Sequence, residues 1–197
     1  MRLVLDWDGT VTERDTLDLV LEEFGDKEIY ERVEAELEAG RMTLNDVIAA
    51  EFATVTAPLD EVVEYVVAEA GIRPGFAELA RARRPLVVSS GFHELIEPVL
   101  EREGLLGEVQ LRANRVDARP DGWLVHFRVE RLCPVCGEPC KRGDLPDDGE
   151  IVYAGDGHSD YCAALAADRV FATGSLARYL EGRGVPYEPL TDFRALL

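Results

Sequence analysis

The chain has 197 residues, of which 47% are hydrophobic, and its formal net charge is −18 at pH 7. This length and composition favour a folded domain with a buried core over a disordered chain. The 39 acidic and 21 basic residues argue against nucleic acid or an anionic membrane as a partner, because both require clustered positive charge. No apolar stretch approaches the ~18 residues of a membrane span, and the strand-like run from Leu3 leaves no room for a leader, so we expect a cytoplasmic protein with reduced cysteines.

The first part of the chain is predicted to be one short strand followed by a block of helices. The strand is the apolar run from residue 3 to the aspartates at 6 and 8. Apolar residues at helical spacing then predict four helices, over 17–24, 29–37, 44–52 and 59–70. Thr43 and Asp46 have the spacing of a capping box at the start of the third.

After Pro74 the pattern changes to alternating strands and helices. Helices are predicted over 76–83, 93–103, 161–167 and 175–181, and strands over 85–89, 109–111, 151–154 and 170–172. Alternating apolar residues at 123, 125 and 127 follow the turn-like segment 120–122 and predict a hairpin. This order indicates an α/β fold, with a mostly parallel sheet covered by helices on both faces.

Four polar clusters fall where strands of this sheet are predicted to end, which is where such sheets bind ligands. In a fully extended strand Asp6 and Asp8 share a face, and Gly9 permits a sharp turn after them. Two carboxylates held close together repel each other unless a cation lies between them or one carries a proton. The other clusters are Ser89-Ser90-Gly91, Lys141, and the segment 155–160 with Asp156 and Asp160.

These residue types can be assembled into a phosphoryl-transfer site. Asp6 can attack a phosphoryl group to form an aspartyl-phosphate, and Asp8 can act as the acid and base for the alcohol and the water. Magnesium prefers oxygen ligands, which Asp6, the backbone carbonyl of Asp8, and Asp156 would supply. Phosphate would be bound by Ser89, Thr10 and the backbone N–H groups of Ser90 and Gly91. Lys141 would neutralise the charge that develops on the phosphoryl group. Asp160 would orient Asp156, Lys141 or a metal-bound water.

The segments DWDGTVT (6–12), VVSSG (87–91), Lys141 and GDGHSD (155–160) resemble, in this order, the four motifs of the haloacid dehalogenase-like phosphatases. The resemblance spans nearly the whole chain and is to the phosphoserine-phosphatase-like branch. It implies a Rossmann-like core formed by 1–12 and 75–197, with a helical cap inserted at 13–74. It also implies magnesium, Asp6 as the nucleophile and Asp8 as the acid/base in hydrolysis of a small phosphorylated metabolite.

Further stretches are similar to a narrower group, the 2-hydroxy-3-keto-5-methylthiopentenyl-1-phosphate phosphatases of methionine salvage. These stretches are VAEAGIRPGFAEL (67–79), GFHELIEPVL (91–100), ANRV (113–116), DGWLV (121–125) and the Cys-Lys pair at 140–141. The alternatives are phosphocholine or phosphoethanolamine phosphatase and phosphoserine phosphatase. The last fits less well, because Asp15 stands where that family has an amine-binding glutamate and Ala49 where it has a carboxylate-binding arginine, although Arg41 can substitute. Asp15 can equally be a helix N-cap, and Phe52 is a further candidate for specificity.

The segment LCPVCGEPCK (132–141) holds Cys133, Cys136 and Cys140 at a spacing that can bind zinc. A structural zinc site needs four ligands, and the sequence leaves His126, Cys162 or a residue of another chain as the fourth. The alternative is a reduced loop that presents Lys141 to the site. The alternative to an enzyme is a non-catalytic binding module that uses this cysteine segment. A binding module, however, would have no physical reason to keep the five charged motif residues together. The oligomeric state and the choice between hydrolysis and phosphotransfer are left open.

Overall fold

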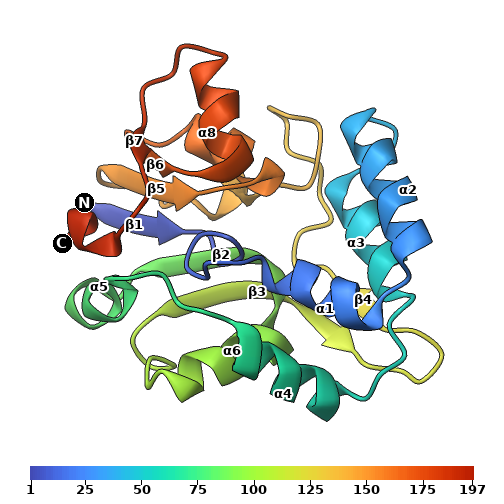
Figure 1. Cartoon of the computed structure of the whole chain (residues 1–197). Helices are drawn as coiled ribbons and strands as arrows, with labels where there is room; N and C mark the ends of the chain where they lie inside the picture. The colour runs from blue at the N-terminus through green and yellow to red at the C-terminus, as the bar shows by residue number, and fades with distance from the viewer.

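The computed structural model describes all residues, 1–197, and has eight α-helices around one seven-stranded sheet (Figure 1). The strand order is β4-β3-β2-β1-β5-β6-β7. All neighbouring strands are parallel except β3 and β4, which form the predicted antiparallel hairpin. The strands are β1 (Arg2–Leu5), β2 (Leu86–Phe92), β3 (Gln110–Asp117), β4 (Leu124–His126), β5 (Ile151–Gly155), β6 (Arg169–Ala172) and β7 (Glu188–Pro189).

The helices are α1 (Thr16–Phe24), α2 (Lys27–Glu38), α3 (Leu44–Phe52), α4 (Leu59–Glu69), α5 (Phe76–Arg83), α6 (His93–Arg102), α7 (Tyr161–Ala164) and α8 (Gly174–Glu181). Each lies where a helix is predicted. Thr43 caps α3 with both reciprocal hydrogen bonds of the predicted capping box. None of the helices has the length and apolar character needed to span a membrane.

The two faces of the sheet are covered by different helices, which confirms the predicted α/β architecture. Side chains alternate between faces along a strand, and the cores on the two sides follow this alternation. Leu5 and Val87 belong to the core on the side of α5 and α6, whereas Val4 and Val88 belong to the core on the side of α7 and α8. The sheet is therefore buried on both sides, and its free polar groups are concentrated at the strand ends.

The predicted helical segment packs partly into the same hydrophobic core as the sheet. Val20 of α1, Phe52 of α3 and Val62 of α4 belong to the large core that also contains residues of β1, β2 and α6. By contrast, Val33 and Leu37 of α2 form a small separate cluster with Val47. Figure 1 shows α2 and α3 beyond the carboxyl ends of β1 and β5, so this helix pair stands over the edge of the sheet where the polar clusters lie.

Candidate active site

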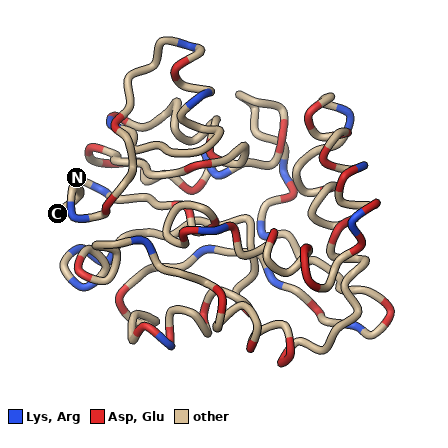
Figure 2. Tube along the Cα trace, in the orientation of Figure 1, with Lys and Arg blue, Asp and Glu red and all other residues tan.

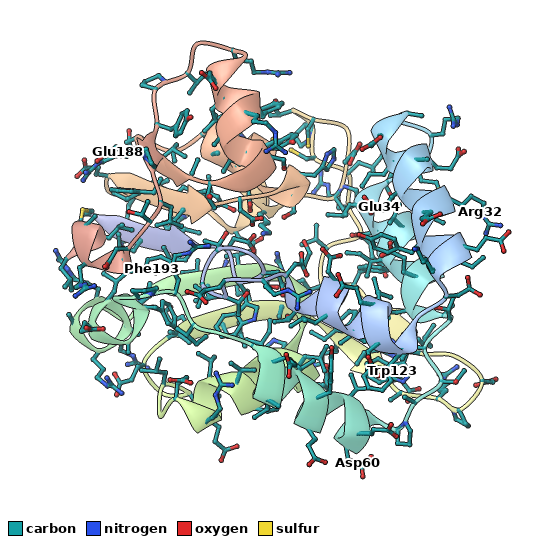
Figure 3. The ribbon with its side chains drawn as sticks, in the orientation of Figure 1. Arg32, Glu34, Asp60, Trp123, Glu188 and Phe193 are labelled. Atoms are coloured by element: carbon teal, nitrogen blue, oxygen red, sulfur yellow. The ribbon has the colours of Figure 1, made fainter.

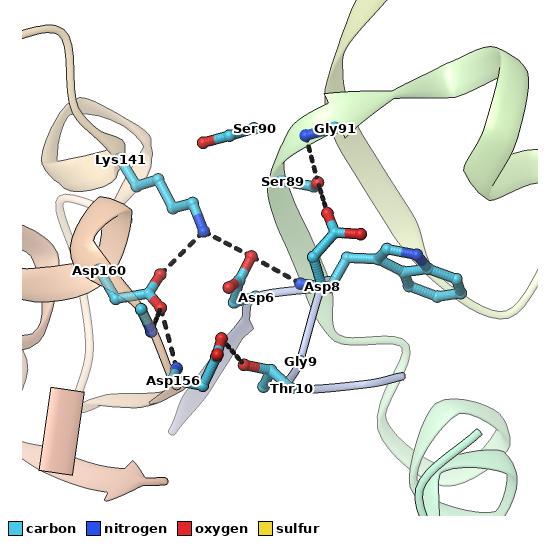
Figure 4. A network of polar contacts seen from close by, with 12 residues as sticks. Asp6, Asp8, Gly9, Thr10, Ser89, Ser90, Gly91, Lys141, Asp156 and Asp160 are labelled. Carbon is cyan, nitrogen blue, oxygen red and sulfur yellow. Dashed lines mark hydrogen bonds and ion pairs between the residues drawn. The ribbon is translucent and has the colours of Figure 1, made fainter. Parts of the chain in front are cut away.

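Asp6 lies at the carboxyl end of β1, the central strand of the sheet. Its backbone N–H donates to the carbonyl of Ala154 in β5 at 2.9 Å, which fixes its position relative to the neighbouring strand. Its Oδ1 accepts hydrogen bonds from the N–H of Trp7 at 2.7 Å and from Nζ of Lys141 at 2.5 Å (Figure 4). Burial and the negative charge of Asp160 raise the pKa of Asp6, although Lys141 acts in the opposite direction.

Asp8 faces the β2 side of the same cleft. The strand β1 ends at Leu5, so the alternation expected for an extended run does not continue to residue 8, and the two carboxylates face different partners. Asp8 Oδ1 accepts hydrogen bonds from the backbone and hydroxyl of Thr16, and Oδ2 accepts one from Ser89 Oγ at 2.9 Å. Burial raises the pKa of Asp8, and these hydrogen bonds oppose the rise. A carboxyl group with a raised pKa is suited to hold a proton for general acid catalysis.

Asp156 follows β5 and lies against the turn after β1. Thr10 Oγ1 donates a hydrogen bond to Asp156 Oδ1 at 3.0 Å (Figure 4). Gly9 has a φ of +67°, and a Cβ there would lie 2.4 Å from Asp156 Oδ2, so only glycine fits this turn. Burial and the charge of Asp160 raise the pKa of Asp156 to about 6. Thr10 was predicted to bind phosphate, and the structure places it as a fully buried residue whose hydroxyl holds Asp156.

Lys141 and Asp160 form a buried ion pair behind the two motif aspartates. Lys141 Nζ lies 2.8 Å from Asp160 Oδ1, which also accepts a hydrogen bond from the hydroxyl of Tyr153 at 2.7 Å. Asp160 Oδ2 accepts the backbone N–H groups of Asp156 at 2.9 Å and of Gly157 at 3.0 Å. Burial alone would raise the pKa of Asp160, but Lys141 and these hydrogen bonds lower it. Asp160 thus joins the lysine to the Asp156 loop.

The predicted phosphate-binding segment at residues 89–91 is partly used within the protein. Ser89 Oγ accepts the N–H of Gly91 at 2.7 Å while its proton points to Asp8. The structure therefore gives Ser89 a direct role in holding Asp8 and shows the Gly91 N–H engaged with Ser89. Ser90 lines the cleft, and its carbonyl accepts a hydrogen bond from Asn114 at 2.7 Å.

Asp6, Asp8, Ser90 and Asp156 line a cavity of about 140 Å³ between the sheet and the helical segment. On the side formed by α1, α2 and α3 it carries apolar residues and carboxylates in addition to Asp15. The apolar residues are Leu17, Leu21, Leu44 and Ile48, and the carboxylates are Asp18, Glu34 and Glu51. Figure 2 shows how densely acidic positions follow one another along α1 and α2, and Figure 3 shows Glu34 on the side of α2 that faces the sheet.

Sequence reasoning missed these three carboxylates on α1, α2 and α3. Glu51 is only 5% exposed, and its Oε1 has no hydrogen-bond partner. Burial, followed by the charges of Glu34 and Asp18, raises the pKa of Glu51 to about 8. The available signal was a glutamate on the predicted helix 44–52 among apolar neighbours, but helical spacing alone does not reveal which face meets the cavity.

Other specificity candidates from the sequence have different outcomes. Asp15 lines the cavity and also caps α1, accepting the N–H groups of Leu17 and Asp18, so both predicted roles are compatible with its position. Arg41 is exposed, pairs with Glu36 and does not line the cavity, so its role as a substrate contact stays a prediction. Phe52 is fully buried in the core and does not line the cavity, so its part in specificity stays a prediction as well.

The carboxylates at the strand ends fit a magnesium ion. Carboxylate oxygens of Asp6, Asp156 and Asp160 lie within 4.8 Å of one another. Because Asp160 is held by Lys141, Tyr153 and backbone N–H groups, the ligands left for an ion are Asp6, Asp156 and the backbone carbonyl of Asp8. These are the hard oxygen donors that Mg²⁺ prefers, and a cation there would offset the repulsion that raises the pKa of both aspartates.

The structure also brings the cysteines together. Cys133, Cys136 and Cys140 lie with Cys162 of α7, and the four Sγ atoms are within 4.8 Å of one another. The backbone N–H groups of Cys136 and Val135 lower the pKa of the Cys133 thiol to about 6. The sequence left three candidates for the fourth ligand, and the fold places one of them, Cys162, beside the other thiols.

Comparison with known proteins finds relatives that match over nearly the whole chain. A 2-hydroxy-3-keto-5-methylthiopentenyl-1-phosphate phosphatase of Geobacillus thermodenitrificans (strain NG80-2) is 26% identical, over 97% of this chain and 91% of the relative. One of the same name from Bacillus thuringiensis (strain Al Hakam) is also 26% identical, over 98% and 92%.

Solved structures show a similar fold. A phosphoserine phosphatase with a phospho-aspartyl intermediate analogue has a TM-score of 0.71 and 19% identity, over 98% of this chain and 95% of its own. A substrate-bound phosphoserine phosphatase has a TM-score of 0.73 and 19% identity, over 99% and 96%. The family model of the haloacid dehalogenase-like hydrolases matches residues 3–165. The chain is therefore a member of the haloacid dehalogenase-like hydrolase family, and within it a phosphatase.

Proposed function

We propose that the protein is a magnesium-dependent phosphomonoesterase that acts on a small phosphorylated metabolite through an aspartyl-phosphate on Asp6. The observation that carries this proposal is the arrangement of three buried groups beside one another at the edge of the sheet. The Asp6 carboxylate is paired with the Lys141 ammonium, and Asp8, with its raised pKa, faces the same cleft from the β2 side. A nucleophile, a cation and an acid are the groups that phosphoryl transfer requires.

The reaction would proceed in two displacements. A carboxylate oxygen of Asp6 attacks phosphorus, the bond to the ester oxygen breaks, and Asp8 gives its proton to the leaving alcohol. Asp8 then takes a proton from a water molecule, whose oxygen attacks phosphorus and releases phosphate from Asp6. Lys141 keeps its charge, because Asp160 and Asp6 raise its pKa despite burial, and it stabilises negative charge throughout. Magnesium held by Asp6, Asp156 and the Asp8 carbonyl would neutralise charge on the phosphoryl oxygens.

The first substrate candidate is 2-hydroxy-3-keto-5-methylthiopentenyl-1-phosphate. The names of the curated relatives support it, and so does the composition of the cleft. The apolar side chains of Leu17, Leu21, Leu44 and Ile48 line the cavity above the motif aspartates. They form a wall suited to an apolar thioether tail, while the phosphate lies toward Asp6.

A second candidate is a phosphate ester that carries an amine, such as phosphoethanolamine, phosphocholine or phosphoserine. The observation that favours it is the group of cap carboxylates formed by Asp18, Glu34 and Glu51, which face the cavity without an arginine or lysine among the lining residues. A cation placed there would relieve the repulsion that raises the pKa of Glu51. Phosphoserine is the least favoured of the three, because its carboxylate would find no arginine in this cavity.

Steady-state phosphate release with magnesium tests the proposal. The panel contains p-nitrophenyl phosphate, the methionine-salvage enol phosphate and the three amine-bearing esters. We expect Asp6→Asn and Asp8→Asn to abolish turnover, and Asp60→Asn, at an exposed position on α4 far from the cleft, to leave it unchanged (Figure 3). Equal rates for wild type and Asp6→Asn on every compound would contradict the assignment of the nucleophile.

The two substrate classes are separated by Glu51→Gln. If the head group is cationic, this change should raise KM for the amine-bearing ester by about tenfold, the cost of one ion pair in a partly buried site. If the substrate is the enol phosphate, KM should change little, because its thioether tail carries no positive charge for Glu51 to pair with. Glu38→Gln, at an exposed position at the end of α2, is the matched control.

A further inference from the structure

All four cysteines of the chain lie at one place, where the loop before Lys141 meets helix α7. This four-cysteine cluster is formed by Cys133, Cys136, Cys140 and Cys162. We propose that it binds one structural zinc ion, which fastens the loop that carries Lys141 to α7. The proposed phosphatase function does not require such a site, and the family resemblance that identifies the catalytic motifs does not supply it.

The spacing of the thiols is the first argument. A tetrahedral zinc ion with Zn–S bonds of ~2.3 Å separates its ligand sulfurs by ~3.8 Å. Cys133 Sγ and Cys162 Sγ are 3.9 Å apart, and all four Sγ atoms lie within 4.8 Å of one another. A disulfide would require ~2.05 Å, and all four cysteines are free. The cluster therefore has the dimensions of a four-thiolate metal site and not of two disulfides.

The backbone around the first two cysteines is the second argument. The N–H of Gly137 donates to the carbonyl of Cys133 at 2.9 Å, and Gly137 has a φ of +80°, so the chain turns tightly after Cys136. The N–H of Val135 points at Cys133 Sγ at 3.5 Å. Backbone N–H groups aimed at a sulfur stabilise its thiolate form, which is the form that binds metal. This turn brings two thiols to the same side of the loop.

The surroundings fit a closed structural site. Four thiolates fill the coordination of zinc and leave no position for substrate or water, unlike catalytic zinc sites. Arg131 and Arg142 line the same surface hollow as Cys133 and Cys140, and they would compensate part of the charge of a tetrathiolate site. Cys136 is exposed, which gives an ion a route to the cluster.

The position of the cluster connects it to the catalytic groups. Cys140 is the residue before Lys141, and Cys162 follows Asp160 by two residues. Each partner of the buried ion pair thus lies within two residues of a ligand of the proposed zinc ion. A metal at this point would hold both ends of the Lys141–Asp160 pair in place, in a loop that otherwise contains little regular structure.

The metal content of the full chain, purified without a polyhistidine tag or chelator, tests the proposal. We expect about one zinc ion per chain by inductively coupled plasma mass spectrometry. Changes to groups that merely orient ligands cost ~10–100-fold in affinity, so losing a ligand in Cys136→Ser should cost at least about 100-fold. Cys136→His should retain zinc, because imidazole also binds it. Val135→Ser, an exposed change in the same turn, is the matched control and should retain zinc as well.

A second measurement on the wild type does not depend on how the variants fold. The reduced, zinc-free protein is titrated with Co²⁺, which should give the intense visible absorption of a tetrahedral cobalt-thiolate centre and lose it on addition of Zn²⁺. No zinc in the purified protein together with no cobalt signal would overturn the proposal, and so would an unchanged zinc affinity of Cys136→Ser, measured by competition with a zinc chelator. Iron in place of zinc would overturn the choice of metal. Because zinc content is measured without substrate, this proposal and the phosphatase proposal can fail separately.

Discussion

Replacing Glu51 by glutamine should change how the stability of the protein depends on pH. Glutamine has nearly the same shape and can fill the same space, but it cannot carry a negative charge. In the native protein burial and the charges of Glu34 and Asp18 raise the pKa of Glu51 from 4.5 to about 8. The folded protein therefore binds a proton between these two pH values that the unfolded chain releases. The resulting stabilisation is complete below pH ~4.5 and is lost as pH rises through about 8.

The size of the effect follows from this shift. Each pKa unit corresponds to ~1.36 kcal/mol, so two units between pH 6 and 8 correspond to about 2.7 kcal/mol of unfolding free energy. Water in the cleft screens Glu34 and Asp18, and the discounted expectation is about 1–2 kcal/mol. Wild type should thus lose this amount relative to Glu51→Gln on going from pH 6 to pH 9. At pH 9 the variant should be the more stable protein.

Urea unfolding followed by circular dichroism at pH 6 and pH 9, with constant magnesium, measures this difference. Glu38→Gln removes the same charge from an exposed position and reports the changes that are common to all variants. If the stabilities of wild type, Glu51→Gln and Glu38→Gln change in parallel with pH, the pKa of Glu51 is not raised and its burial among carboxylates has been misread.

Two further predictions concern the turn after β1 and the acid/base group. Gly9→Ala should lower the free energy of unfolding by about 1–3 kcal/mol, because alanine is strained at this positive φ and its Cβ would displace the Asp156 carboxylate. For the second reason it should also raise the magnesium concentration needed for half-maximal activity. Thermal unfolding followed by circular dichroism measures the first effect, and phosphate release as a function of magnesium concentration measures the second. Ser89→Ala should lower kcat by about 10–100-fold at saturating magnesium, since Asp8 loses a hydrogen bond that orients it. An unchanged kcat would show that Thr16 alone suffices to hold Asp8.

Local patterns predicted most of the fold correctly. The helix over 76–83 and the capping box at Thr43 depend on side chains within a few residues of each other, and both are confirmed. The end strand β7 was not predicted, because it has only two residues and pairs through its backbone with β6. Strand β3 extends beyond the predicted 109–111 to Asp117, where it pairs with β4. Its second half was missed because polar residues form its outer face, so it does not read as an apolar run.

The gathering of the motif residues at one edge of the sheet was predictable for a simple topological reason. Parallel strands end at the same edge of the sheet, so polar residues that follow different strands must gather there. The side chains contributed by helices were not predictable in this way. Arg41 forms a local ion pair with Glu36 and is held away from the cavity, whereas Glu51 lines it. Which face of a helix meets the cleft is decided by how that helix packs, and that information is spread over the whole chain.

The unequal anchoring of the helical segment determines how substrate would enter and phosphate would leave. Helices α1 and α4 share the main core with the sheet, so moving them would expose large buried surfaces. The buried residues of helix α2, Val33 and Leu37, belong only to the small cluster, and its Tyr30 is only partly buried against the main core, yet the helix carries Glu34 at the cavity wall. We expect exchange to occur by excursions of α2 alone. The cavity would then have one mobile wall, α2, while its other walls stay fixed. We expect substitutions in α2 to change the size of the preferred substrate more readily than substitutions in α1 or α4.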